Sequence, residues 1–445
     1  MAQELIRGYG RKNISARCMI KMDLQKAYDS ISWSFVESLL RSLGFPHPFV
    51  CWIVTCLTTV SYQICLNGQA LESFEGKKGL RQGDPISPYL FVLCMEYLSR
   101  MMKKLQHHPS FRYHPMCNTF KITHLTFADD LLFFSKGTEN PVAVLLEVFE
   151  QFSETSGLVA NKNKCEIYFG GVTQAKRDSI TVAAQIKEGS LPFRYLGRPL
   201  NAKRLSILQY QPLLEKMVAK VRHWTAKFLS YGGRVQLIKS VLYAIQNYWS
   251  QVLLFPKKVL VAIEAICRKF LWTGECGDSR KALVAWEELC RPKSEGGLGF
   301  MHLPSWNKTC FLKLLWALNS KAEKLWVRWI HGYYIKGQDV MHVDIPSQAS
   351  YLIKKVLKVR QLVIGNGTWQ KQVGEQKFEM SLIYREIWPP VQKVNWREYV
   401  LNNLATPRAQ FILWLILRGR IATKSRLQKF GVQVDPICMF CGTEF

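Results

Sequence analysis

The first two hundred residues alternate between apolar and polar positions in short blocks that are typical of a mixed helix-and-sheet domain. Residues 18–23 form an apolar run that ends in a carboxylate, Asp23, and this run predicts a β-strand. Residues 32–43 repeat apolar side chains at helical spacing and stop before Gly44 and Pro46, so they predict a helix. A second helix is predicted over residues 88–105.

The same pattern predicts two hairpins in this part of the chain. Residues 62–66 lead into Asn67-Gly68, a dipeptide that favours the tight turn of a two-residue hairpin. Residues 124–134 consist of two apolar arms, HLTF and LLFF, on either side of Asp129 and Asp130. We therefore expect an acidic corner between two strands.

Beyond residue 205 the strand signals fade and longer helical patterns replace them. Residues 211–229 and 235–248 are the clearest helices, with two glycines between them. The stretch RPKSEGGLGFMHLPSW predicts a connector or a surface loop. Residues 335–385 show only weak periodicity and receive no assignment. A last unit begins near Asn395 and contains an apolar helix followed by basic residues.

The charge of the chain points to a polyanionic partner. The 60 lysines and arginines exceed the 33 acidic residues, which gives a net charge of +27. No run of 18 apolar residues and no apolar N-terminal segment occurs, so nucleic acid is favoured over a membrane as that partner. The thirteen cysteines are scattered, which indicates reduced thiols in an intracellular compartment.

The acidic corner carries the strongest chemical signal. Two adjacent carboxylates, Asp129 and Asp130, repel each other unless a cation lies between them and a partner. Asp23, at the end of another predicted strand, is the natural third ligand. Carboxylate oxygens and phosphate substrates suit a pair of Mg²⁺ ions, one activating a 3′-hydroxyl and one holding a triphosphate. The alternative is a solvated hairpin tip without function.

Two neighbouring features favour a functional site. The stretch GLRQGDPISP is fixed by two glycines and two prolines, and it leaves Arg81 and Gln82 free to present hydrogen-bond donors. Tyr28 follows Asp23 by five residues, where an aromatic ring could exclude a 2′-hydroxyl. The alternatives are an ordinary loop at the start of a helix and a core tyrosine.

Five ordered motifs carry a resemblance to a known family. They are KMDLQKAYDSISW, GLRQGDPISPYLF, LTFADDLLFFSKG, SGLVANKNKCEIYFGG and LPFRYLGRPL. In this order they resemble the palm motifs of LINE-type non-LTR retrotransposon reverse transcriptases, the plant versions most closely. The last fifty residues resemble the start of the reverse-transcriptase zinc-binding domain of that family. The resemblance implies an α+β fold with a right-hand polymerase palm, a helical thumb or connection region and a small C-terminal helical unit.

Carried over position by position, the resemblance implies roles for the acidic residues and one lysine. Asp23, Asp129 and Asp130 would form the metal-binding triad for two Mg²⁺ ions. The backbone carbonyl of Leu24 would also reach a metal. Lys164 in NKNKCE would protonate the departing pyrophosphate, with a solvated loop lysine as the alternative.

The resemblance also implies a substrate-binding surface. Tyr28 matches the steric gate, where the family more often has Phe. Gln82 and Gly83, which follow Arg81 in the chain, match the loop that packs against the incoming nucleotide and the template. The turn that would grip the primer end consists of Tyr195, Leu196 and Gly197. The basic helices that follow would hold the backbone of a duplex through phosphate contacts and shape.

The chain departs from the family at both ends. Only 22 residues precede Asp23, so we expect most of the fingers, and the upstream endonuclease, to be missing. Cys438 and Cys441 form only half of a metal site, so we expect no bound zinc. The expected domains are a palm over 1–200, a helical region over 201–334, an unassigned linker over 335–394 and a truncated zinc-binding domain over 395–445.

These observations leave three hypotheses. The first is an RNA-directed DNA polymerase that uses an RNA template, a DNA primer and dNTPs, as a fragment with little activity alone. The second is a non-catalytic remnant of a retroelement that binds nucleic acid through its basic surface. The third, a group II intron maturase or another cellular reverse transcriptase, is disfavoured by the tail that resembles the zinc-binding domain. A functional polymerase of this kind would be expected in the nucleus.

Overall fold

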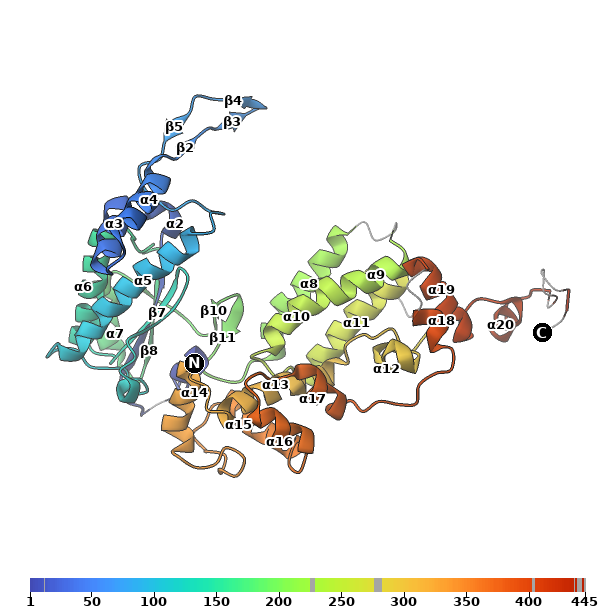
Figure 1. Cartoon of the computed structure of the whole chain (residues 1–445). Coiled ribbons are helices and arrows are strands. Elements are labelled where there is room, and N and C mark those ends of the chain that lie inside the picture. The colour runs from blue at the N-terminus through green and yellow to red at the C-terminus, as the bar shows by residue number, and fades with distance from the viewer. Residues whose placement is uncertain are drawn as a thin grey trace. The chain divides into compact units, whose positions relative to one another are not determined.

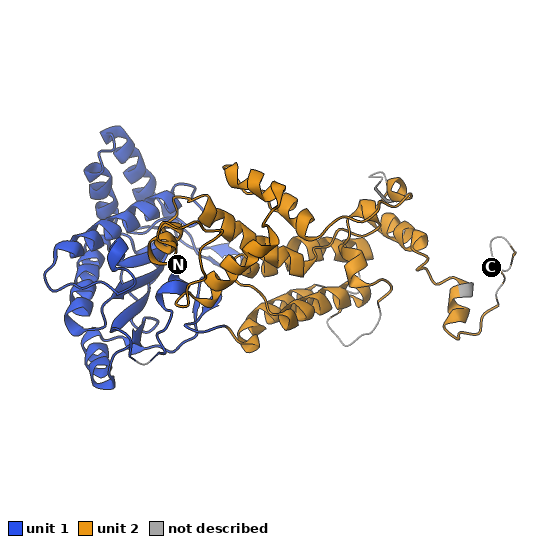
Figure 2. Cartoon of the chain, turned by 90° about the horizontal axis from the view of Figure 1, so that it is seen from below, with its two compact units in different colours: residues 1–204 blue, residues 205–445 orange. Residues whose placement is uncertain are grey.

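The computed structural model of the chain describes residues 1–11, 13–224, 229–275, 282–401, 405–435, 437, 442 and 443. The chain divides into two compact units, Met1–Arg204 and Leu205–Phe445, which Figure 1 shows element by element and Figure 2 in two colours. Unit 1 contains the β-sheet, and unit 2 is built from helices. Within the described ranges, no helix combines the length and the apolar character needed to cross a membrane.

The centre of unit 1 is a five-stranded sheet in the order β6-β7-β1-β8-β9. Its central strand, β1 (Arg17–Asp23), pairs antiparallel with both neighbours. Alternation along β1 sends Cys18 and Ile20 into the helix-covered core and Lys21 and Asp23 to the opposite face. The strands predicted over residues 18–23 and 124–134 are confirmed. The other strands are β6 (His124–Phe127), β7 (Asp130–Ser135), β8 (Glu166–Gly170) and β9 (Lys187–Glu188).

Helices cover one face of this sheet because their apolar sides meet the apolar residues that the strands present to that face. The helices predicted over 32–43 and 88–105 are confirmed as α3 (Trp33–Ser42) and α5 (Ser87–Lys104). Phe91 of α5 and Phe133 of β7 lie in the same buried core. The remaining helices are α1 (Ala2–Leu5), α2 (Ala27–Ser30), α4 (His47–Thr58), α6 (Glu139–Ser156) and α7 (Gln174–Ala184).

A two-part ribbon extends from the helices of unit 1 beyond α4 (Figure 1). Its outer hairpin turns at Asn67 and Gly68, whose φ angles are +50° and +83°. Positive φ at both central residues is the signature of the turn predicted for this dipeptide, so that hairpin is confirmed. The ribbon consists of β2 (Ser61–Tyr62) with β5 (Phe74–Glu75) and β3 (Cys65–Leu66) with β4 (Gln69–Ala70).

A buried histidine lies among aromatic rings in unit 1. The His114 ring is fully buried, stacks on Tyr9 at 6.0 Å and meets the Phe134 ring edge-on at 5.9 Å. Its Nδ1 accepts a hydrogen bond from the backbone N–H of Met116 at 3.1 Å. Burial, and then the positive charge of Arg17, lower the pKa of His114 to about 3. His114 is therefore neutral in the folded protein at neutral pH.

This burial predicts a loss of stability in acid. Unfolded His114 takes up a proton below pH 6.5, whereas the folded residue stays neutral down to about pH 3. The contribution of neutral His114 to the free energy of unfolding is therefore complete above pH 6.5 and is lost as the pH falls from 6.5 toward 3. At pH 4.5 the loss is roughly 3 kcal/mol. Urea unfolding of unit 1 should show a smaller loss of stability between pH 6.5 and 4.5 in His114→Phe than in the parent, because buried His124, with a pKa lowered to about 4, contributes the same loss in both proteins. Equal slopes in the two proteins would contradict the assignment.

Unit 2 packs its helices around a second core. The predicted helices over 211–229 and 235–248 correspond to α8 (Gln211–His223) and to α9 (Tyr231–Leu237) with α10 (Tyr243–Ser250), joined by a π-turn. The further helices are α11 (Lys257–Thr273), α12 (Trp286–Cys290), α13 (Leu303–Asn319), α14 (Leu325–Ile330), α15 (Tyr351–Lys358), α16 (Gly367–Gly374), α17 (Met380–Ile387), α18 (Arg397–Leu401), α19 (Pro407–Leu417) and α20 (Lys424–Lys429).

The glycine-rich stretch after α12 connects it to α13, so the connector alternative is confirmed, whereas the surface-loop alternative is wrong for residues 295–298, which are buried. The carbonyl oxygen of Gly296 accepts hydrogen bonds from the Trp414 indole at 2.9 Å and from Arg418 Nε at 3.0 Å. A Cβ on Gly297 would lie 2.0 Å from the carbonyl oxygen of Arg291. The glycines are therefore there to let backbone and side chains approach closely.

Helices also occupy the stretch 335–394, to which the sequence assigned no element. Three helices of eight residues, α15, α16 and α17, pack against α13 within unit 2. Each is only about two turns long, so an apolar repeat has too few positions to stand out from the sequence.

Candidate catalytic site

The site begins with two aspartates that face each other across neighbouring strands. Asp23, the last residue of β1, is the register partner of Asp130, the first residue of β7. Directly opposed residues of an antiparallel pair point to the same face of the sheet, so both carboxylates lie on the face away from the helices. Asp129 lies in the turn before β7, next to Ala128 with φ of +50°, and is exposed.

The electrostatics show that these carboxylates interact. The pKa of Asp130 is raised, first by burial, then by the charge of Asp129 and to a smaller extent by Asp23, while Lys21 opposes the rise. A cation between the carboxylates would relieve this repulsion, so the donor set fits a hard divalent ion. Among the described residues, no three His, Cys, Asp or Glu side chains form a metal site by themselves. Mg²⁺ commonly needs only one or two carboxylates, because water and substrate phosphates complete its shell.

Lys21 is a charged residue of this face that the sequence analysis did not select. It lies two positions before Asp23 on β1, so strand alternation places it on the same face. Its Nζ lies 5.9 Å from the centroid of the Phe193 ring, and its charge counteracts the pKa rise of Asp130. The alternation of β1 was the signal that could have identified it.

Lys164, in the turn before β8, approaches the carboxylate of Asp23. Its Nζ lies 3.6 Å from Oδ2 of Asp23, and its side chain is 69% exposed. The turn is fixed to β1, because the N–H of Asn161 donates to the carbonyl oxygen of Asp23 at 2.8 Å. Leu24, whose carbonyl was assigned to a metal, is buried and forms a β-bridge with Ala160. An exposed ammonium group therefore lies beside Asp23 at the end of β1.

The loop predicted to contact nucleotide and template is attached to Tyr28. The N–H of Leu80 donates to the carbonyl oxygen of Tyr28 at 2.6 Å, and the Tyr28 ring stacks on Phe91 at 4.9 Å. The next three residues of the loop, Arg81, Gln82 and Gly83, are exposed. Tyr28 and this loop therefore form one connected surface, in which the Tyr28 ring packs on Phe91.

The predicted primer-gripping turn is the tip of a separate hairpin, β10 (Phe193–Tyr195) with β11 (Arg198–Leu200). Leu196 and Gly197 have φ of +48° and +68°, the geometry of a tight two-residue turn. Burial, and then the charge of Asp130, raise the pKa of Tyr195 to about 12. The hairpin thus lies close enough to Asp130 for the charge of that carboxylate to affect the pKa of Tyr195.

Cys438 and Cys441 lie outside the described residues. The prediction that they bind no zinc in this chain stays a prediction.

Comparisons with known proteins identify two domain families in the chain. Residues 3–200 match the family described as reverse transcriptase (RNA-dependent DNA polymerase), and residues 378–445 match the zinc-binding region in reverse transcriptases. The chain therefore carries a reverse-transcriptase domain over residues 3–200.

The relatives of the chain narrow this class. A Drosophila melanogaster Pol polyprotein from the type-2 retrotransposable element R2DM is 31% identical over 163 residues, which cover 36% of this chain and 15% of the relative. An Arabidopsis thaliana protein named as a ribonuclease H protein is 30% identical over 140 residues, 32% of this chain and 23% of the relative. The chain is similar to proteins of non-LTR retrotransposons and of plant retroelements, and it spans less than a quarter of the length of these two relatives.

Among solved structures, a telomerase from Candida tropicalis in complex with a fragment of telomeric RNA is similar, with a TM-score of 0.32 and 12% identity. The match covers 73% of this chain and 50% of the telomerase.

Proposed function

We propose that the chain is an RNA-directed DNA polymerase that transfers a nucleotide from a dNTP to a primer 3′-end with two Mg²⁺ ions. The observation that carries the proposal is the cross-strand pair of Asp23 and Asp130 with Asp129 in the adjoining turn. Three carboxylates from two strand ends supply the hard oxygen ligands that the ions need. Bound Mg²⁺ would lower the pKa of the primer 3′-hydroxyl and neutralise charge on the triphosphate.

The chain's own side chains then have distinct roles. Lys164 pairs with Asp23 at 3.6 Å and is mostly exposed, so its ammonium group is free to turn toward a departing pyrophosphate and donate a proton. The Tyr28 ring, held by Phe91, would meet a 2′-hydroxyl and exclude ribonucleotides. Residues 81–83 would pack against the nucleotide and the template, and residues 195–197 against the primer.

A second candidate function is nucleic-acid binding without catalysis, as a retroelement remnant. The net charge of +27 favours it, because that charge gives salt-dependent affinity for RNA whether or not catalysis occurs. Primer extension on an RNA template with Mg²⁺ and dNTPs separates the two functions. Incorporation that depends on the acidic residues supports the polymerase. RNA binding without incorporation supports the remnant.

Replacing Tyr28 with Ala should relax the choice of sugar. The small side chain leaves space for a 2′-hydroxyl, so the preference for dGTP over GTP should fall on the order of tenfold to a hundredfold. The ratio of kcat/KM for the two nucleotides measures it. Tyr28→Phe keeps the ring and should keep the preference. An unchanged ratio in Tyr28→Ala would exclude the gate.

A further inference from the structure

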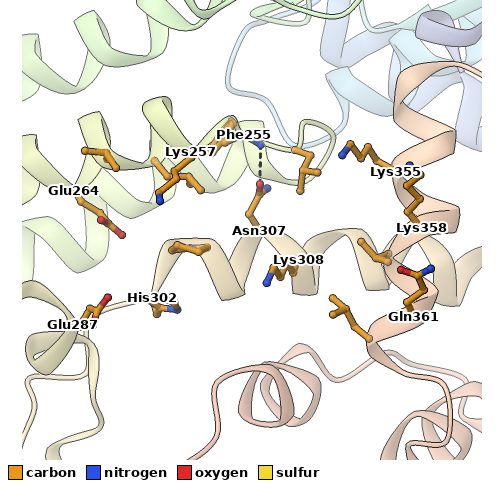
Figure 3. A pocket seen from close by; sticks show the side chains of 16 residues that line it. Phe255, Lys257, Glu264, Glu287, His302, Asn307, Lys308, Lys355, Lys358 and Gln361 are labelled. Carbon is orange, nitrogen blue, oxygen red and sulfur yellow. Dashed lines mark hydrogen bonds between the residues drawn. The ribbon is translucent and has the colours of Figure 1, made fainter.

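A cavity of about 620 Å³ lies within unit 2, bordered by residues of α11, α13 and α15 (Figure 3). Its lining includes the apolar side chains of Leu260, Val261 and Leu362. Val261 and Leu362 remain 54% and 46% exposed, although they flank a concave surface rather than a convex one. Partly exposed apolar walls in a concave site are typical of a surface that receives a flat apolar group.

One wall of the cavity is fixed in place by Asn307. Its Oδ1 accepts a hydrogen bond from the backbone N–H of Phe255 at 2.8 Å, drawn in Figure 3, and its Nδ2 donates to the carbonyl oxygen of Leu253 at 3.0 Å. The side chain therefore binds α13 to the segment before α11. A buried, satisfied amide of this kind keeps the cavity preformed, so a ligand need not order it.

Two carboxylates mark one end of the cavity. Glu264 and Glu287 lie at that end in Figure 3, with His302 beside Glu287. Burial, and then the charge of Glu287, raise the pKa of Glu264, so the two acids sense each other. Burial lowers the pKa of His302 to about 4, which keeps the ring neutral at pH 7. This end therefore offers hydrogen-bond acceptors and no counter-charge from His302, although Lys257 of the lining lies beside Glu264 in Figure 3.

Lysines mark the other end. In Figure 3, Lys355 and Lys358 lie beside Gln361, far along the cavity from the two glutamates, with Lys308 between the two ends. Within the part of the chain that the structure describes, these three ammonium groups form no ion pair and no hydrogen bond; Lys355 only approaches the Tyr351 ring at 5.4 Å. Unpaired cations at a concave site favour a phosphate.

We propose that this cavity binds a guanine nucleotide within single-stranded RNA, with the base edge on the glutamates and the phosphates on the lysines. A carboxylate accepts the N1–H and the N2–H of guanine together, whereas uracil offers a single N–H donor. The apolar side chains of the lining would contact the base, and both glutamates at one end with Lys355 and Lys358 at the other would fix its direction. The site belongs to unit 2 and does not rest on the polymerase proposal.

Fluorescence anisotropy with labelled RNA octamers tests the proposal on the full chain, without Mg²⁺ or dNTPs. The probes are octa-uridine and the same octamer with one central guanosine or one central inosine, which lacks the 2-amino group. We expect the guanosine probe to bind about tenfold more tightly than octa-uridine, with inosine between them. Glu264→Gln should bring this ratio close to one, because an amide presents only one acceptor to the base.

The phosphate end has its own variants. Lys355→Gln/Lys358→Gln should weaken the guanosine probe about tenfold and reduce the dependence of log Kd on log salt by about 1.4. Lys371→Gln/Lys377→Gln removes the same charge from exposed positions of unit 2 outside the cavity and should change affinity less than about twofold. Circular dichroism checks that each variant is folded.

Two outcomes would overturn the proposal. The first is a parent chain that binds all three octamers equally, since the glutamates then read no base. The second is an equal loss of affinity in the two double-lysine variants, since the binding is then general attraction to a basic surface. If a protein segment and not RNA occupies the cavity, RNA binds only to the general basic surface, and the two double-lysine variants lose affinity equally.

Discussion

Asp129→Asn should lower nucleotide incorporation on an RNA template by roughly a thousandfold. The change removes a charge from the turn that adjoins the Asp23–Asp130 pair, while the amide keeps the size of the side chain. A bound metal supplies several kcal/mol of charge stabilisation in the transition state, and each 1.4 kcal/mol corresponds to tenfold in rate. Single-turnover primer extension with Mg²⁺ and dNTPs measures the rate.

The matched control is Asp178→Asn, which removes the same charge from an exposed position of unit 1 on α7. This variant should extend the primer like the parent. RNA affinity, measured without dNTPs, should stay within about twofold in both variants, because phosphate contacts come from lysine and arginine. If the parent incorporates no nucleotide but binds RNA, the remnant is the correct function. If Asp129→Asn remains active, Asp129 is not a metal ligand.

Short apolar runs made the central strands of the sheet in unit 1 predictable. The strand 18–23 and the arms on either side of Asp129 and Asp130 follow directly from short apolar runs, which are buried almost throughout in β1 and β7. The turn at Asn67-Gly68 was predictable because this dipeptide tolerates positive φ at both positions. Local sequence was sufficient in these cases because local backbone geometry decides the structure.

Other features depend on residues far apart in the chain. The pairing of Asp23 with Asp130 requires the register between β1 and β7, which neither segment carries alone. The buried connector at Gly296 is fixed by Trp414 and Arg418, more than a hundred residues away. The cavity in unit 2 likewise joins α11, α13 and α15. Such features arise from packing, so a pattern along the chain gives no direct signal for them.

The loop beside Tyr28 gives the second large expected effect. Gly79 has φ of +93°, and a Cβ there would lie 2.8 Å from the Cα and the carbonyl oxygen of Asp29. Its N–H donates to the carbonyl oxygen of Ile31 at 2.7 Å, and its own carbonyl oxygen accepts from the Trp33 indole at 2.7 Å. Backbone atoms hold the glycine on both sides, so the clash cannot be relieved by rotating a side chain.

Gly79→Ala should therefore destabilise unit 1 by about 3 kcal/mol, combining left-handed backbone strain with overpacking. Gly83→Ala is the matched control, because Gly83 has φ of +94° but no atom within 4 Å of the added Cβ. It should cost only about 1 to 2 kcal/mol, the backbone strain alone. Hydrogen exchange of unit 1 peptides across a urea series measures both losses. Equal losses would mean that backbone strain, and not contact with Asp29, fixes this loop against Tyr28.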